Sequence, residues 1–559
     1  MLLFIGVPRF VVLSALISFL ATLSLLISGC SFQSLDADCI VHNGSILTLD
    51  PENSMAQALA IKDGRILEIG ANRQILNKYR APVQIDLRGG VVTPGLMDAH
   101  AHLIGYADGL LEADLVGTDS WDEVLEKVVS HAKEHPSTWI RGRGWDQNDW
   151  LQAEWPNRRT LDSLFPNVPV VLERIDGHAI MVNGEGLRRV GLTCDMEQDG
   201  GVILCDENNE PTGVLIDEMA NRVLRFMPEY DSLYRVQAFL EAQTKMLEHG
   251  LTQITDAGLS SKEIERLLAF EKQGLLKLRI NAMVSGNDDD IGWLLENGPI
   301  TTDRLTVQSV KFYMDGALGS RGAMLIDPYS DLKGWRGVSM LDRDWFKNQL
   351  EHLHASGMQA ATHCIGDSAV RLVLNAYAEV LDGPNDRRWR IEHAQVVAKD
   401  DMNQFGAYHI IPSIQPTHAT SDMYWAGERL GRNRIRRAYA YQELLAQNGM
   451  VALGTDFPVE DIDPRKTMFA ATARRDAAGY PDEGFQMKNA LTPDQTLRGM
   501  TQWVALTQFQ EQDLGTIEVG KFADFTWMDR NWLKVSPKDL LSTRIMGTCI
   551  EGEWVYLNE

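Results

Sequence analysis

The chain has 559 residues, 44% apolar and 23% charged, a balance that excludes collagen-like, coiled-coil and wholly disordered proteins. Asp and Glu outnumber Lys and Arg by 77 to 53, which gives a net charge of −24 at pH 7. Because so acidic a protein repels phosphate backbones on average, we expect no nucleic-acid partner.

The chain begins with an export segment. Residues 10–28 are uncharged and mostly apolar, and they lead into Ile27-Ser28-Gly29-Cys30, which resembles a bacterial lipobox. We therefore expect 1–29 to be a lipoprotein signal peptide and Cys30 to be lipidated. The body would then be exported and anchored to a bacterial membrane, on its periplasmic face; Ser31 favours the outer membrane. An uncleaved anchor or an ordinary signal peptide is the alternative.

Short strands are expected at both ends of the mature chain. Between residues 38 and 70, two apolar runs flank Asp63-Gly64, which is a hairpin signal. Residues 515–529 and 545–556 show the same pattern near the carboxyl end. We expect residues 30–90 and 506–559 to form one small β-sandwich from both termini.

Eight short apolar runs separated by helical stretches fill the centre of the chain. They are Gly90–Asp98, Gly250–Asp256, Leu278–Val284, Val307–Asp315, Met358–His363, Trp389–His393, Ile410–Gln415 and Met450–Asp456. Eight βα units in series is the number that closes a TIM barrel. The sequence therefore predicts an α/β fold with a (β/α)8 barrel over residues 91–505.

One gap between these runs is too long for a single crossover. We expect residues 103–245 to form an insertion after barrel strand 1, with hairpin signals of its own. Loops on that side of a barrel carry the active site, so the insertion would roof it. Cys194 and Cys205 could form a disulfide in an oxidising compartment; free thiols are the alternative.

Histidine and aspartate side chains stand at the carboxyl ends of the predicted strands. His100 and His102 follow the first run, and residues i and i+2 of an extended chain point the same way. His363, His393 and Asp456 end the fifth, sixth and eighth runs. A single such histidine is more often a polar core residue. Together, at the rim where barrel residues act, they indicate a metal site.

Lys311 lies inside the fourth run, where a cation is costly to bury. An ion pair with Asp315 is one interpretation. The other is a neutral amine beside metal ions, which can take up carbon dioxide and become a carbamate. A carbamate would replace the cation by a bridging carboxylate.

This set of residues resembles the amidohydrolase superfamily. Longer strings resemble its amidohydrolase 3 branch, the YtcJ-like proteins that include N-substituted formamide deformylases. The strings are WIRGRGWD (139–146), RIDGHAIMVN (174–183), PTGVLIDE (211–218), VKFYMDGALGSRGA (310–323), THCIGD (362–367), RIEHAQ (390–395) and GTDFPVE (454–460). The resemblance implies a (β/α)8 barrel with a split β-sandwich, one or two divalent ions, with zinc as the first choice, and metal-assisted hydrolysis.

The resemblance also implies roles for individual residues. His100 and His102 resemble ligands of the more buried ion, with Asp456 near it. His363 and His393 resemble ligands of a second ion. Lys311 resembles the N6-carboxylated bridge between the two ions; if it stays an ammonium, the centre holds a single ion.

We expect the chain to cleave a carbon–nitrogen bond of a small non-peptide amide, such as an N-substituted formamide. A divalent ion lowers the pKa of water toward ~7 and polarises the amide carbonyl. Asp456 would serve as general acid and base, since one carboxylate can move the proton from water to the departing amine. His178 would hydrogen-bond the developing oxyanion; a local loop contact is the alternative.

Two further side chains are candidate substrate contacts. Arg321 could bind a substrate carboxylate or fix its own loop. Trp145 belongs to a tryptophan-rich stretch that could line the substrate site or form the core of the insertion.

Other functions share these residues. Hydrolysis of cyclic imides or esters uses the same metal chemistry. The rival from another class is an exported, lipid-anchored protein that binds a metal or solute without turnover. The natural substrate, the metal and the presence of a homodimer are left open by the sequence.

Overall fold

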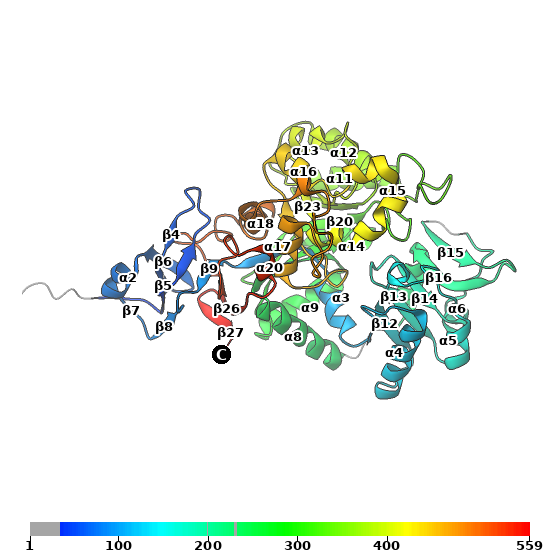
Figure 1. Cartoon of the computed structure of the whole chain (residues 1–559), viewed down its shortest axis with the longest axis horizontal. Helices are drawn as coiled ribbons and strands as arrows, with labels where there is room; N and C mark the ends of the chain where they lie inside the picture. The colour runs from blue at the N-terminus through cyan, green and yellow to red at the C-terminus, as the bar shows by residue number, and fades with distance from the viewer. Residues whose placement is uncertain (1–33, 198–199, 229–231, 559) are drawn as a thin grey trace, which may run out of the picture.

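The structure is a computed structural model that describes residues 34–197, 200–228 and 232–558. The expected signal segment and Cys30 lie outside the described residues. In the part of the chain that is described, no helix is both long and apolar enough to cross a membrane. Figure 1 shows a β-sandwich on one side, a barrel in the middle and a separate lobe on the other side.

Eight parallel strands form the barrel, one for each predicted run. They are β10 (Leu96–Ala101), β17 (Leu251–Leu259), β18 (Arg279–Ser285), β20 (Leu305–Tyr313), β21 (Gln359–Cys364), β22 (Arg390–His393), β23 (Ile411–Ile414) and β24 (Ala452–Leu453), side by side in chain order. The ring closes just after β24, where Asp456 N–H donates to His100 O and His102 N–H donates to Phe457 O, both at 2.8 Å. The predicted (β/α)8 barrel is confirmed.

Helices with one apolar face cover the outside of the barrel. They include α8 (Ser232–Glu248), α9 (Ser261–Lys272), α10 (Asp288–Asn297), α11 (Arg343–Ser356), α12 (Asp367–Leu381), α13 (Asn403–Ala407), α16 (Tyr441–Asn448) and α18 (Pro493–Gly499). In α12, buried Val370, Val373, Leu374 and Tyr377 follow the helical period of three to four residues. At the start of α9, Ser260 and Glu263 form a reciprocal capping box.

Both chain ends contribute to the β-sandwich. One sheet has the order β6 (Arg65–Gly70), β5 (Ala58–Lys62), β2 (Cys39–His42), β8 (Val83–Asp86). The other has the order β27 (Glu553–Leu557), β26 (Ile545–Ile550), β25 (Phe525–Met528), β9 (Val91–Pro94), β3 (Ser45–Leu47), β4 (Met55–Ala56). Buried Val41, Ile61, Val92 and Phe525 pack between them.

The boundary between sandwich and barrel differs from the expected one. β9 pairs with β25 and β3, so its backbone hydrogen bonds are used within the sandwich. The barrel therefore begins at Leu96, not at residue 91. The apolar run that we expected to be one strand is divided at Gly95, where the chain passes from one sheet to the other.

The insertion forms the separate lobe. Its sheet has the order β11 (Ala113–Asp114), β12 (Ile140–Trp145), β13 (Val170–Arg174), β14 (Ala179–Val182), β16 (Pro211–Asp217), β15 (Gly201–Cys205), packed with α4 (Trp121–Glu134), α6 (Gly184–Val190) and α7 (Glu218–Phe226). Cys194 and Cys205 form a disulfide with their Cα atoms 6.2 Å apart. Because α8 packs against the barrel, the lobe ends before residue 232 rather than at 245.

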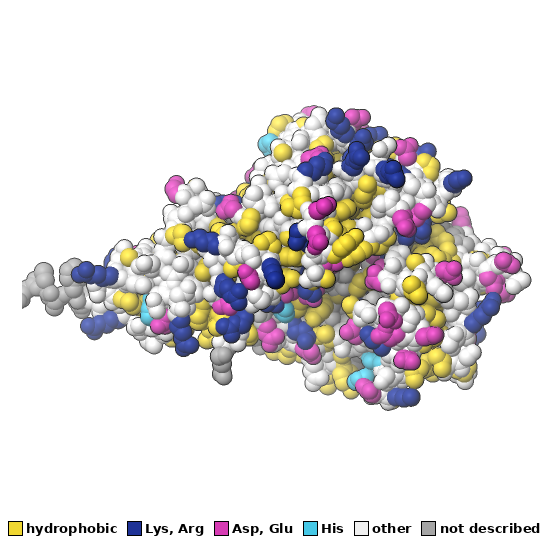
Figure 2. All heavy atoms as spheres, viewed as in Figure 1, with side chains coloured by type: hydrophobic (Ala, Val, Ile, Leu, Met, Phe, Trp, Pro, Cys, Tyr) yellow, Lys and Arg dark blue, Asp and Glu magenta, His cyan; other side chains and the backbone are white. Residues whose placement is uncertain are grey.

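The surface carries no large area of one charge sign on the face seen in Figure 2, where acidic and basic side chains alternate. On this face the acidic side chains are therefore not gathered in one patch.

Candidate metal centre

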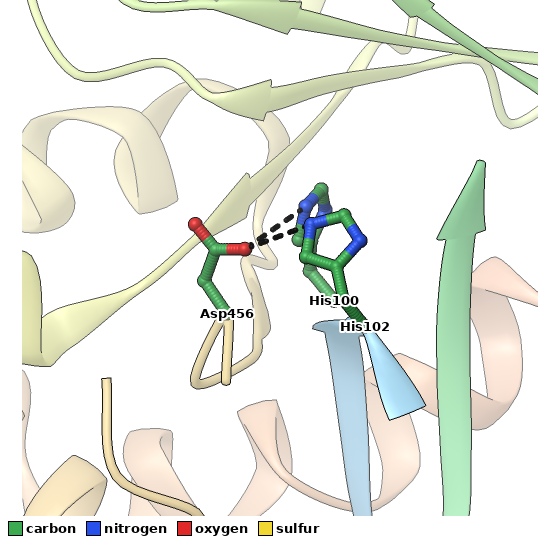
Figure 3. Close-up of side chains that lie close together, drawn as sticks. All are labelled: His100, His102 and Asp456. Carbon is green, nitrogen blue, oxygen red and sulfur yellow. Dashed lines mark ion pairs between the residues drawn. The ribbon is translucent and has the colours of Figure 1, made fainter. Parts of the chain in front are cut away.

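Two imidazoles and one carboxylate meet at the mouth of the barrel. His100 is the next-to-last residue of β10, and His102 directly follows the strand, so both imidazoles point toward Asp456 (Figure 3). Asp456 lies in the segment that follows β24. Oδ1 of Asp456 lies 3.2 Å from Nε2 of His102 and 3.5 Å from Nε2 of His100. The expected convergence of residues i and i+2 is therefore present.

A second group shares the same carboxylate. Oδ2 of Asp456 lies 3.9 Å from Nδ1 of His393 and 3.5 Å from Nε2 of His418. The ring of His363 is 4.6 Å from that of His393, centroid to centroid. The structure thus brings four predicted histidines, His100, His102, His363 and His393, together around the predicted Asp456 and adds His418, which sequence reasoning missed.

His418 could have been found from its position. It lies in α14 (Pro416–Ser421), which directly follows β23, so it stands near the carboxyl end of the seventh strand. The predicted pattern covered only residues at the strand end itself, and His418 lies a few residues beyond Ile414, where β23 ends.

Two of the ligand positions have a strained backbone. His393 has φ of 70° and Asp456 has φ of 64°, both in the left-handed region that residues with a side chain rarely adopt. Such conformations persist where the surroundings fix them, and they cluster at functional sites. In each case the residue sits where a strand ends and the chain turns into the mouth of the barrel.

The donor atoms of this site fit a divalent cation. Among the described residues, Oδ1 of Asp456, Nε2 of His363, Nδ1 of His393 and Nε2 of His418 are buried and have no hydrogen-bond partner. Buried polar atoms are nearly always paired, so four unpaired atoms in one place are the arrangement expected of a site that binds an ion. Imidazole nitrogen and carboxylate oxygen are the donors that zinc and related ions prefer.

The protonation states agree with this fit. Burial, reinforced by neighbouring positive groups, holds the pKa of His363 and of His393 well below its ordinary value. Burial opposes ionisation of Asp456, but the imidazole of His102, 3.2 Å from Oδ1, and the adjacent rings of His100 and His393 hold its pKa well below the ordinary value. Neutral imidazoles and an ionised carboxylate are the forms that bind metal.

Lys311 reaches the same centre. Its fully buried Nζ lies 3.1 Å from Nε2 of His100. Burial lowers the pKa of this amine to about 8, although Glu392 and Asp456 counteract the shift. The alternative ion pair with Asp315 is not formed: that carboxylate instead accepts backbone hydrogen bonds from Met324, Ile365 and Gly366 at 2.7–3.0 Å.

A buried charge network behind His100 was also missed. Nδ1 of His100 lies 2.6 Å from Oε2 of Glu392, and Arg390 pairs with the other oxygen of Glu392 at 2.6 Å. Arg390 and Glu392 alternate in β22, so both point to one face of a buried strand. A pair of opposite charges inside an apolar run was the signal that could have revealed it.

His178 belongs to the inserted lobe and lies beside the centre formed by the barrel residues. The histidine stands between β13 and β14, and its ring lies 5.2 Å from that of His363. Its Nδ1 is 2.8 Å from Oδ1 of Asp217, which ends β16. Burial opposes protonation of His178, but Asp217 outweighs that effect and raises its pKa.

Arg321 and Trp145 do not take the substrate-binding positions that we expected. Arg321 pairs with Asp331 at 2.9 Å and lines a separate, largely apolar hollow. Trp145 is fully buried, donates to Leu172 O at 2.8 Å and packs against Trp150 in the core of the lobe. Both follow the alternative interpretations, because the aromatic residues are needed to build the lobe's own core.

Two cavities open beside the centre. The smaller, of about 170 Å³, includes His393, His418 and Asp456 in its wall. The larger, of about 470 Å³, includes His102, Lys311 and Asp456. His178 and His363 border both, so a small molecule in either cavity would meet the centre.

Comparison with known proteins identifies the family to which the chain belongs. The amidohydrolase family model matches residues 84–556, which is most of the sequence. The chain belongs to the amidohydrolase family. Membership in this family, with metal-type ligands gathered at the barrel mouth, makes it a metal-dependent hydrolase.

Individual amidohydrolases align with the chain over nearly their whole length. The putative amidohydrolase YtcJ of Bacillus subtilis is 31% identical, over 92% of this chain and 99% of the relative. The N-substituted formamide deformylase of Arthrobacter pascens is 26% identical, over 93% and 98%. The crystal structure of an uncharacterized metal-dependent hydrolase from Pyrococcus horikoshii superimposes with a TM-score of 0.73, at 26% identity, covering 89% of this chain and 99% of that one. The resemblance to YtcJ and to the deformylase that the motifs suggested is confirmed.

Proposed function

We propose that this amidohydrolase cleaves the carbon–nitrogen bond of a small non-peptide amide of the N-substituted formamide type. The observation that carries the proposal is the position of Asp456, whose two oxygens face two groups of imidazoles and whose Oδ1 has no hydrogen-bond partner. The Arthrobacter relative is an N-substituted formamide deformylase, which supports the choice of bond.

The proposed reaction gives Asp456, His178 and Asp217 separate roles beside the ion. When bound, the divalent ion polarises the substrate carbonyl and lowers the pKa of water toward ~7. Asp456 accepts the proton of the attacking water and returns it to the departing amine. His178 donates a hydrogen bond to the developing oxyanion, and Asp217, 2.8 Å from its Nδ1, fixes the orientation of the ring.

The proposed centre holds zinc through His100, His102, His363, His393 and Asp456. Lys311, with a pKa of about 8, has a neutral amine fraction that can take up carbon dioxide. Because Nζ of Lys311 lies 3.1 Å from Nε2 of His100, the N6-carboxylated form would place a carboxylate beside that imidazole and so favour two ions. Metal analysis together with the intact mass of Lys311 peptides prepared without acid tests both statements.

We also propose that the protein acts outside the cytoplasm, lipid-anchored through Cys30 to the periplasmic face of a membrane. The Cys194–Cys205 disulfide supports an oxidising compartment. Labelling of the wild-type chain by a fatty-acid analogue, and loss of the label in Cys30→Ser, is the expected result; unlabelled wild-type chain would contradict the anchor.

The Asp456→Asn variant tests the activity. It should lower kcat by about 10²- to 10⁴-fold, because the amide cannot relay the proton. Replacement of the exposed Asp482 by Asn is the matched control.

The assay measures amine release from N-formyl and N-acyl amines, with a cyclic imide and an ester in the same panel. Stoichiometric zinc without turnover of any member would favour the binding protein, and turnover of the imide or ester alone would change the substrate class.

A further inference from the structure

A cavity of about 170 Å³ lies beside the metal centre, between the lobe and the barrel. His418 and Asp456 belong to its wall, and each has a buried polar atom without a hydrogen-bond partner. A substrate whose carbonyl is at the metal therefore has room for a substituent in this cavity, and the cavity of about 470 Å³ borders the same centre.

Carboxylates outnumber cations among the charged side chains in the rest of the wall. Its one guanidinium, that of Arg174, is 1% exposed and is already paired with both Asp146 and Asp176. That leaves one surplus negative charge in the trio, before any other carboxylate is considered. The cavity offers no free cation, among the described residues, to an anionic substituent.

Two more carboxylates of the wall have only uncharged partners. Asp422 accepts from the Tyr439 hydroxyl at 2.7 Å and from Gln395 Nε2 at 3.2 Å. Glu460 accepts from the Ser421 hydroxyl at 2.6 Å. Neither forms an ion pair with a Lys or Arg of the described chain. Burial raises the pKa of both carboxyls to about 7, which reflects the missing countercharge.

Two further residues of the wall favour a cationic occupant over a neutral one. The indole of Trp425 lines the cavity, and an aromatic face attracts a cation that has left water. Exposed Asp149 stands at the edge of the same cavity and adds a further negative charge. A cationic group would favour the ionised form of these half-buried carboxylates, whereas an apolar group would give them no countercharge.

We infer that this cavity selects amides whose nitrogen substituent carries a positive charge, held by Asp422, Glu460 and Trp425. The inference rests on the proposed function, since it names the class of amine that the reaction releases. The tryptophan-rich stretch of the insertion gives the substituent no apolar wall here, because Trp145 and Trp150 lie in the core of the lobe.

A pair of substrates with the same shape tests the inference on the wild-type holoenzyme. N-[3-(Dimethylamino)propyl]formamide is cationic at neutral pH, and N-(4-methylpentyl)formamide replaces its nitrogen by CH. We expect kcat/KM, measured as formate release, to be at least tenfold higher for the cationic member. Equal or higher values for the neutral member would overturn the inference and leave the amide activity standing. Formate release from neither, and no turnover in the wider amide panel, would overturn the proposed function.

Substitutions in the cavity test which residues cause the preference for the cationic substrate. In Asp422→Asn/Glu460→Gln, the ratio of kcat/KM for the cationic to the neutral substrate should fall about tenfold. Asp482→Asn/Glu483→Gln removes the same charge from exposed positions and should keep the wild-type ratio. Trp425→Leu should lower the ratio to a smaller extent. An unchanged ratio in the cavity variant would show that these carboxylates do not select the substrate.

Discussion

Nδ1 of His100 lies 2.6 Å from Oε2 of Glu392, and both side chains are completely buried. The carboxylate holds the proton on Nδ1, so the lone pair of Nε2 faces the centre. Histidines that bind metals are commonly oriented by such a partner. Glu392 is in turn paired with Arg390, which donates to Ala99 O at 2.7 Å and so ties β22 to the first barrel strand.

Glu392→Gln should therefore weaken zinc binding by about 10- to 100-fold. It should also lower the free energy of unfolding by about 3–5 kcal/mol, because buried Arg390 loses its countercharge. Competition with a chelator measures the first effect and urea unfolding the second. Exposed Glu483→Gln is the control. Wild-type zinc affinity in Glu392→Gln would show that His100 needs no such partner.

Asp217 is expected to act on the reaction only through His178. Asp217→Asn keeps the shape of the side chain but removes the charge that faces Nδ1 at 2.8 Å. We expect kcat to fall about tenfold, with a smaller change in KM, since the contact serves the transition state.

A double-mutant cycle separates this positioning role from a structural one. His178→Asn/Asp217→Asn should be no slower than His178→Asn alone, because the two residues form one unit. Glu207→Gln, exposed in the same lobe, is the control and should keep wild-type kcat. Additive losses in the double variant would mean that Asp217 affects catalysis by another route.

The barrel could be predicted because its strands are buried on both faces. Such strands read as short continuous apolar runs, and all eight were recognisable. The end of the first run was predicted too, but its beginning was not. Pro94-Gly95 is a dipeptide typical of a break in a strand, and it was the signal for the point where the chain leaves one sheet and enters another.

The candidate ligand positions could be predicted where the residue is the last or next-to-last of its strand, as at His393 and His363. His418 follows its strand by several residues, and Glu392 faces inward from within one, so neither has the same pattern. Arg321 and Trp145 were placed by residue type alone. The structure pairs the first with Asp331 and buries the second, since contacts made far along the chain decide such positions.

The disulfide should stabilise the lobe. Cys194 and Cys205 are 11 residues apart, and closing a loop of that size restricts the unfolded chain. By the chain-entropy relation this contributes about 2–3 kcal/mol. Urea unfolding with and without dithiothreitol measures it. Cys194→Ser/Cys205→Ser should be less stable by that amount and insensitive to the reductant. Equal stability of oxidised and reduced wild type would contradict the prediction.

Gly454 is needed where the barrel closes. A Cβ at this position would lie 2.5 Å from the backbone nitrogen of His100 and 2.7 Å from Oδ1 of Asp98. That carboxylate also accepts from Thr455, so it cannot move without breaking the link between β10 and the segment that carries Asp456. An added methyl group must therefore push the two strands apart.

Gly454→Ala should lower the free energy of unfolding by about 1–3 kcal/mol, the usual cost of overpacking a core. It should also lower kcat by more than tenfold, because His100 and Asp456 would separate. Gly427→Ala in α15 (Ala426–Arg434) is the matched control: its Cβ meets nothing within 4 Å, so it should be neutral or slightly stabilising. A soluble Gly454→Ala protein with wild-type turnover and zinc content would show that the strand ends tolerate the extra volume, and that the spacing of His100 and Asp456 does not depend on this contact.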